Sequence, residues 1–166
     1  MSNKIIDIQK NFKTNNNFNN FNNFNPILFE HDFQIKCINN IYFDISFQYK
    51  ELFHKEIKKK INGYKSQDKK KFINNDYNII NLISFDDIVE KLVKSKLSCY
   101  YCSNKIFIIY KYIRDNNQFT LDRLNNHDIH TNNNTIISCY KCNIKRRNQN
   151  SEKFKLSKNL INIKKI

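Results

Sequence analysis

The chain has 166 residues and a formal net charge of +14, from 29 Lys and Arg against 15 Asp and Glu. It contains no apolar run approaching the roughly 20 residues of a membrane span and begins without the apolar core of a secretory signal, so we expect a soluble, intracellular protein with no membrane partner. The charge makes nucleic acid the leading partner, because such an excess attracts a polyanion and binds it in a salt-dependent way.

The amino-acid composition offers a second explanation of the charge. The chain is rich in Asn, Lys, Ile, Phe and Tyr, contains no alanine, and has one glycine and one proline. The abundant residues have A/T-rich codons, so part of the lysine excess can record the base composition of an AT-rich organism or of a large DNA virus. The length suits a small module with a helical neighbour.

Four segments are predicted along the chain. Residues 1–25 repeat Asn and Phe with little charge, and such a tract cannot bury enough surface to offset its ordering entropy, so we expect a disordered tail. Residues 26–96 are expected to form a mainly helical, basic region, and residues 97–150 a zinc-binding module. Residues 151–166 are a basic tail to which no role is assigned.

Two helices are predicted in the basic region. Apolar residues spaced by three and four over residues 45–61 favour one helix face, and Gly63 then suits the C-terminal cap. Ser84 and Asp87 have the spacing of a capping box, which predicts a second helix over residues 85–96.

The pattern changes to strands in the C-terminal half. Residues 105–112 form a β-branched and aromatic run that predicts a strand, and residues 119–124 are its expected returning partner in a hairpin. Residues 135–138 predict a short strand, and the residues from Cys142 onward predict a helix.

Two Cys-x2-Cys pairs bracket these strands, with 36 residues between the pairs. Two such turns supply four thiolates, the tetrahedral shell that structural Zn²⁺ prefers. The alternatives are two disulfides, which are disfavoured in an intracellular chain, or unrelated free thiols. A zinc held between a knuckle and the first turn of a helix is a treble clef, so we predict an α+β fold with a zinc-bound treble-clef ββα module. The predicted zinc ligands are Cys99, Cys102, Cys139 and Cys142.

A second metal site is predicted between the cysteine pairs. Hydrolysis of a phosphodiester needs a Lewis acid on the phosphate and a base for the attacking water. Asp122, at the end of a predicted strand, and Asn143, directly after the last cysteine, could offer a carboxylate and a carbonyl oxygen to one Mg²⁺. The basic residues on or beside the last helix are predicted either to contact DNA phosphates or to neutralise the zinc–thiolate centre. They are Lys141, Lys145, Arg146 and Arg147.

A set of fixed spacings lies within residues 97–149. It comprises Leu121-Asp122-Arg123-Leu124-Asn125-Asn126, then His130-Thr131 and Asn134, and finally Cys139-x2-Cys142-Asn143 with Lys145-Arg146-Arg147. This set resembles the HNH endonucleases of the His-Me finger group, above all the zinc-bound forms of phages and giant DNA viruses. The resemblance implies a DNA endonuclease with a structural Zn²⁺ and a catalytic Mg²⁺ or Mn²⁺.

The resemblance also assigns roles to individual residues. Asp122 and Asn143 take the places of the family's metal ligands, and Asn134 that of the asparagine that holds the loop by hydrogen bonds. Arg123 stands where much of the family has the histidine that acts as general base. A guanidinium stays protonated and cannot act as that base, although it can clamp a phosphate through two hydrogen bonds.

The general base is therefore sought in the loop after Arg123. His130 is the first candidate because Asp-Arg variants that resemble this chain often carry His or Tyr there, and His127 is the second. Two other functions stay open: a zinc finger that binds nucleic acid without cutting it, and a purely structural zinc protein. The sequence does not determine the oligomeric state.

Overall fold

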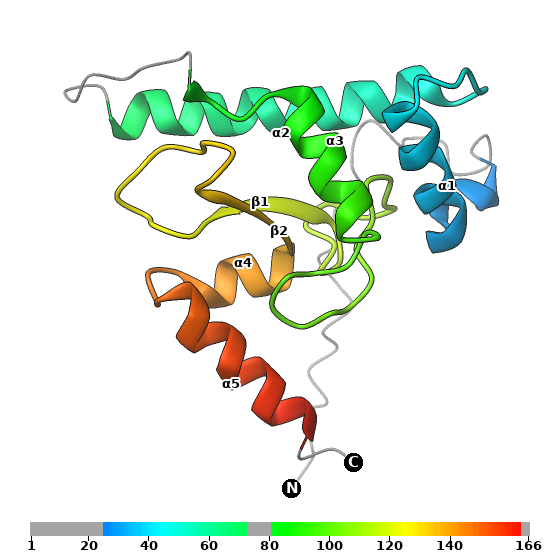
Figure 1. Ribbon diagram of the computed structural model, residues 1–166. Helices are drawn as coiled ribbons and strands as arrows, with labels where there is room; N and C mark the ends of the chain where they lie inside the picture. The colour runs from blue at the N-terminus through cyan, green and yellow to red at the C-terminus, as the bar shows by residue number, and fades with distance from the viewer. Residues whose placement is uncertain (1–24, 73–80, 164–166) are drawn as a thin grey trace, which may run out of the picture.

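The computed structural model describes residues 25–72 and 81–163 (Figure 1). Most of the predicted N-terminal tail lies outside these residues. Within them the fold is α+β, as predicted, and no helix is long and apolar enough to span a membrane. The elements in chain order are η3 (Pro26–Phe29), α1 (His31–Tyr42), α2 (Lys50–Lys71), α3 (Phe85–Lys94), β1 (Phe119–Arg123), β2 (Thr135–Cys139), α4 (Tyr140–Arg146) and α5 (Ser151–Ile163).

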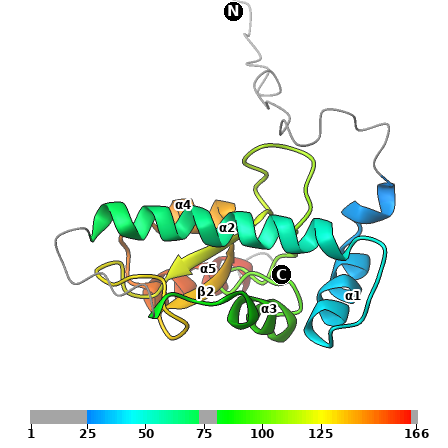
Figure 2. The same cartoon turned by 90° about the horizontal axis from the view of Figure 1, so that it is seen from above.

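The centre of the C-terminal half is an antiparallel pair of strands. β1 pairs with β2 from Phe119 opposite Cys139 to Arg123 opposite Thr135, and residues 124–134 form the loop between them. α4 follows β2 directly and packs on both strands. Figure 1 shows α2 along one side of this pair and α4 and α5 on the other, and Figure 2 shows α2 crossing over the strands.

The predicted hairpin between residues 105–112 and 119–124 is wrong. β1 pairs with β2 instead, and the earlier run makes only isolated bridges, Ser98 with Lys105 and Phe107 with Gln118. The side chains of Ile106, Ile108, Ile109 and Tyr110 are nevertheless buried, whereas Tyr112 is exposed. The β-branched and aromatic composition of this run therefore indicated buried side chains and not a strand.

The side chain of Gln34 makes the hydrogen bonds that a neighbouring strand would otherwise make to the backbone of this run. It is fully buried on α1; its Oε1 accepts from the backbone N–H groups of Ile108 (2.7 Å) and Ile109 (3.2 Å). Its Nε2 donates to the carbonyls of Leu28 (2.7 Å) and Ile109 (2.8 Å). One amide group thus satisfies buried backbone groups that a neighbouring strand would otherwise pair.

Gln34→Ala is expected to lower the free energy of unfolding by about 2–3 kcal/mol, because it leaves these buried backbone groups without their partner. Urea denaturation followed by circular dichroism measures the change. Gln48→Ala, at an exposed position, is the matched control and should change the value by less than about 0.5 kcal/mol. Equal effects of the two substitutions would contradict this account of the 105–112 run.

The first predicted helix differs from the observed one at both ends. α2 begins at Lys50 and continues to Lys71, so Gly63 lies inside the helix and is not a C-terminal cap. A Cβ at Gly63 would meet nothing within 4 Å, which shows that the glycine occupies an open position. The helix continues because Tyr64 and Asp68 extend its inner face beyond the glycine.

The second predicted helix is confirmed with a shorter end. α3 spans Phe85–Lys94, and the Ser84 and Asp87 side chains form the predicted capping box. α1 and α5 were not predicted, although α1 buries residues 34, 37, 38 and 41 at helical spacing. One cluster of buried side chains joins these helices to the strand pair, so the core runs across the predicted boundary at residues 96 and 97.

Candidate functional site

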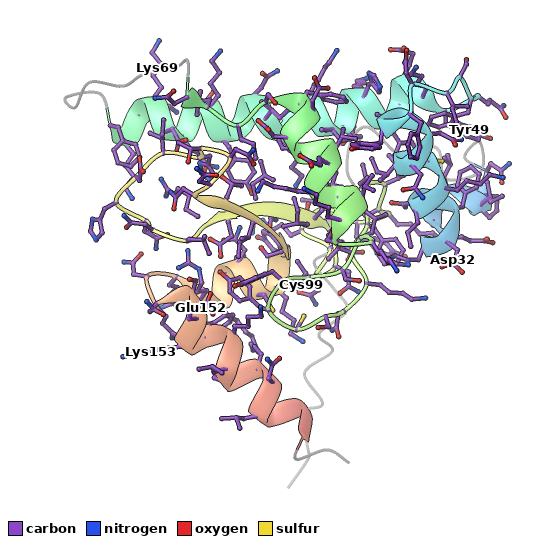
Figure 3. All side chains as sticks on the ribbon, in the orientation of Figure 1. Asp32, Tyr49, Lys69, Cys99, Glu152 and Lys153 are labelled. Atoms are coloured by element: carbon purple, nitrogen blue, oxygen red, sulfur yellow. The ribbon has the colours of Figure 1, made fainter. Side chains whose placement is uncertain are left out.

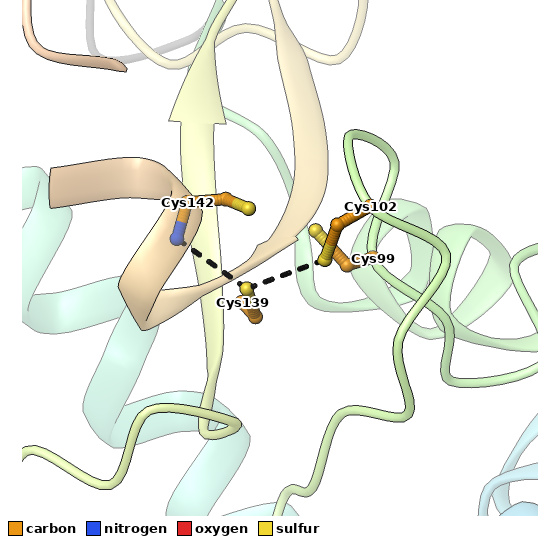
Figure 4. A group of neighbouring side chains, drawn as sticks. All are labelled: Cys99, Cys102, Cys139 and Cys142. Carbon is orange, nitrogen blue, oxygen red and sulfur yellow. Dashed lines mark hydrogen bonds between the residues drawn. The ribbon is translucent and has the colours of Figure 1, made fainter. Parts of the chain in front are cut away.

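The four predicted zinc ligands lie together at one end of the strand pair. Cys99 and Cys102 come from the turn after α3, Cys139 ends β2, and Cys142 lies in the first turn of α4 (Figure 4). Their Sγ atoms are all within 4.8 Å of one another, and those of Cys102 and Cys139 are 3.9 Å apart. A tetrahedral ion with Zn–S bonds of about 2.3 Å places its sulfurs about 3.8 Å apart. The cluster could therefore hold a metal ion such as zinc.

Local backbone geometry explains why the thiols converge. The turn after Cys99 closes when the N–H of Ser103 donates to the Cys99 carbonyl (2.9 Å), and Ser103 adopts a positive φ of 57°. Cys139 caps α4 and its Sγ accepts from the N–H of Cys142 (3.4 Å). Hydrogen bonds among the thiols lower the pKa of Cys102 and raise the pKa values of Cys139 and Cys142, as expected when neighbouring thiols share protons.

A cavity of about 400 Å³ lies over β1, between the C-terminal half of α2 and α4. It brings together four of the five predicted catalytic residues, Asp122, Arg123, His130 and Asn143. A neighbouring hollow of about 420 Å³ continues it along the loop after β1. The side chains of Lys71, Asn126, Arg146 and Asn148 line both spaces.

Asp122 is buried and held by two partners. Its Oδ2 accepts from Arg146 Nε (2.6 Å) and from the Tyr101 hydroxyl (2.7 Å), and its Oδ1 accepts from Arg146 Nη2 (2.7 Å). A carboxylate has about four lone-pair positions, so one position on Oδ1 remains for a metal ion. Burial and the charge of Asp122 raise the pKa of Tyr101, so this residue of the cysteine turn stays a donor.

Asn143 reaches the same cavity from α4. Its Nδ2 donates to the carbonyl of Leu121 (3.3 Å), which leaves Oδ1 as the ligand atom that it can offer. The set of one carboxylate oxygen and one amide oxygen suits a hard divalent cation such as Mg²⁺ or Mn²⁺.

Arg146 was predicted as a possible DNA contact, but its side chain points into the protein. Its side chain is buried, and beyond Asp122 it donates to the carbonyls of Arg123 (2.7 Å) and Gln149 (2.8 Å) and to Asn126 Oδ1 (2.7 Å). Nothing in the sequence indicated this burial, because Arg146 stands in a basic stretch in which the apolar Ile144 is exposed. The other three predicted contacts, Lys141, Lys145 and Arg147, are exposed.

His130 is buried at the wall of the cavity that faces α2. Its Nδ1 lies 2.9 Å from both carboxylate oxygens of Asp68, and its backbone N–H donates to Asp68 Oδ2 (2.8 Å). The ring of Tyr64 packs against the imidazole with centroids 4.7 Å apart. His127, the second candidate base, is exposed and lines the neighbouring hollow.

Arg123 contacts the same carboxylate as His130. Its Nη1 donates to Asp68 Oδ1 (3.3 Å) and to the carbonyl of Asp128 (3.2 Å). Burial would raise the pKa of Asp68, but the hydrogen bonds from His130 and the charge of Arg123 outweigh it and hold that pKa below its usual value. Asp68 is therefore a charged carboxylate at neutral pH, and it was missed because it stands among lysines in a segment predicted to follow the helix.

Asn134 lies outside the cavity and closes the loop after β1. Its Oδ1 accepts from the N–H of Asn125 (2.8 Å), and its Nδ2 donates to the carbonyls of Asn125 (3.0 Å) and Ile129 (2.9 Å). These bonds hold the loop that carries His130 against the start of the strand pair.

Comparison of the chain with protein-family models, curated proteins and solved structures finds no match. The site is therefore interpreted from its own geometry. A four-cysteine cluster is joined through Tyr101 to a cavity lined by one carboxylate, one imidazole, four amides and several cations.

Proposed function

We propose that the protein is a metal-dependent DNA endonuclease of the HNH type, in which a four-cysteine zinc holds a treble-clef ββα module. One observation carries the proposal. Asp122 on β1, His130 in the loop and Asn143 on α4 line a single cavity, together with Arg123. These are the residue types that phosphodiester hydrolysis requires: ligands for a hard cation, a base and a cation for the phosphate.

The chemistry follows from the atoms that each residue can offer. A water oxygen forms a bond to phosphorus while a phosphate ester bond breaks; the water's proton passes to His130 Nε2, and the departing oxygen takes a proton from solvent. Nε2 is the nitrogen for this role because Asp68 engages Nδ1. A divalent cation held by Asp122 Oδ1 and Asn143 Oδ1 would supply Lewis-acid stabilisation of charge on the phosphate.

The charge around the cavity supports a polyanionic substrate. Lys71, Arg123 and Arg147 line the cavity, and Lys141 and Lys145 are exposed on α4. Cations of this kind bind phosphates and make affinity fall with salt. The formal net charge of +14 has the same effect over longer distances.

Incubation of zinc-loaded protein with supercoiled plasmid and Mg²⁺ or Mn²⁺ tests the proposal. We expect the wild type to cut, and Asp122→Ala, Asn143→Ala and His130→Ala to cut at least about 100-fold more slowly. Asn143→Ala is the most informative variant, since this half-buried side chain makes one long hydrogen bond and its loss should disturb the fold little. Asp122→Ala also leaves the buried Arg146 without its carboxylate partner. Asn133→Ala, exposed in the same loop as His130, is the matched control and should cut like the wild type.

A second function is favoured by one observation. Arg146 neutralises Asp122 through two hydrogen bonds, which suits a zinc protein that binds nucleic acid without cutting it. A wild type that retards the plasmid in a salt-sensitive way and never cuts with either metal would select this function. Absence of any DNA affinity at physiological salt would instead leave a purely structural zinc protein.

A further inference from the structure

We infer that Asp68 on α2 is a positioning residue, which fixes the imidazole of His130 so that Nε2 faces the cavity as a proton acceptor. The expected effect on cleavage rests on the proposed nuclease function, whereas the position of the ring hydrogen is inferred from geometry alone. It also gives a role in the site to α2, which precedes the predicted module of residues 97–150.

The carboxylate of Asp68 is fully buried, and three donors from the C-terminal half of the chain surround it. They are His130 Nδ1 (2.9 Å), the His130 backbone N–H (2.8 Å) and Arg123 Nη1 (3.3 Å). A buried carboxylate without partners would be strongly unfavourable, so these donors and the acid specify one another's positions. Two of the three donors belong to His130, which fixes both its backbone and its ring.

The chemistry of the carboxylate then selects the tautomer of His130. An ionised carboxylate only accepts hydrogen bonds, so Nδ1 must carry the hydrogen that it shares with Asp68. In the neutral imidazole, Nε2 is then the nitrogen with the lone pair, as a base requires. Metal-binding and catalytic histidines are commonly oriented in this way by a second side chain.

Tyr64, one helical turn before Asp68, also contacts the imidazole. Its ring packs on the imidazole at 4.7 Å with an interplanar angle of 50°, and its hydroxyl accepts from the backbone N–H of Leu121 on β1 (3.3 Å). The same stretch of α2 therefore contacts the strand of Asp122 and the loop of His130. With the backbone and the ring both held, the imidazole has little freedom to rotate away from the cavity.

Asp68→Asn tests the inference with little change in shape. The amide oxygen can still accept from the His130 backbone, but the amide nitrogen takes the place of Oδ1, where it points a donor at Nδ1 and no longer accepts from Arg123. The hydrogen on Nδ1 loses its ionised acceptor, so the tautomer with the hydrogen on Nε2 is favoured. We expect kcat for plasmid cleavage to fall about 100-fold while KM changes less than about twofold. ¹⁵N NMR of the imidazole at mildly alkaline pH should show an unprotonated Nε2 in the wild type and a protonated Nε2 in the variant.

Asp32→Asn is the matched control, since Asp32 is exposed on α1 (Figure 3), far from the cavity, and should leave kcat, KM and the spectrum unchanged. The inference is overturned if the wild type carries its hydrogen on Nε2, or if Asp68→Asn cuts as fast as the wild type. A wild type that never cuts contradicts the proposed function alone. The NMR spectrum of the wild type, which requires no variant to fold, then still tests whether Asp68 holds the ring hydrogen on Nδ1.

Discussion

Removal of the metal is expected to unfold the C-terminal half of the protein. The four cysteines of the proposed zinc site come from the turn after α3, the end of β2 and α4, and structural zinc sites contribute on the order of 10 kcal/mol to folding. Cys142→Ser removes one of four ligands and leaves three thiolates crowded together without a full shell. We expect the variant to lose its zinc, measured by elemental analysis, and its cooperative thermal transition, measured by circular dichroism.

Cys37→Ala separates loss of the metal from loss of a buried thiol. Cys37 is buried on α1 outside the cluster, and burial raises the pKa of its thiol to about 11, so it is not a thiolate at neutral pH. This control should keep one zinc per chain and a cooperative transition. If Cys142→Ser also keeps one zinc per chain, or if a strong chelator leaves the wild-type transition unchanged, the cluster does not hold a structural metal.

Replacement of Arg146 by Met is expected to lower the free energy of unfolding by about 3–5 kcal/mol, because it leaves the Asp122 carboxylate buried without its cation. Urea denaturation of the zinc-saturated proteins measures the loss. The double variant Asp122→Asn with Arg146→Met should recover a large part of it, since the uncompensated charge is then gone.

Arg147→Met is the control for this pair, because Arg147 is exposed and its loss should change stability by less than about 0.5 kcal/mol. The two arginines are adjacent and carry the same charge, so the difference between the two changes in the free energy of unfolding measures the effect of burial. An Arg146→Met protein as stable as the wild type that binds DNA more weakly would contradict this account. It would return Arg146 to the phosphate-contacting role that the sequence predicted.

Features that depend on neighbouring residues were predictable from the sequence. The capping box of Ser84 and Asp87 starts α3, and the strands over residues 119–124 and 135–138 appear within a residue of their predicted ends. The Cys-x2-Cys spacing predicted four converging thiols because each turn fixes two of them locally. The grouping of Asp122 with Asn143 follows from the same turns, which place β1 beside α4.

Features that depend on distant partners were not predictable in this way. Residues 105–112 have the composition of a strand, yet their backbone is satisfied by Gln34, more than 70 positions earlier. Arg146 looks like its basic neighbours in sequence but turns inward to Asp122. Asp68 stands in a lysine-rich stretch, and only the docking of α2 on the strand pair reveals its contact with His130.

The contact between α2 and the loop after β1 joins residues that are 62 positions apart in the chain. The entropy cost of closing such a loop grows only as about (3/2)RT ln n. Beyond Gly63, the contacts that offset it include those of Tyr64 and Asp68 with His130 and the hydrogen bond from Lys71 Nζ to the Asn126 carbonyl (2.5 Å). None of these contacts involves the four-cysteine cluster. A chain cut before residue 97 would keep Asp122, Asn143 and all four thiolates, yet its histidine would have lost its carboxylate partner.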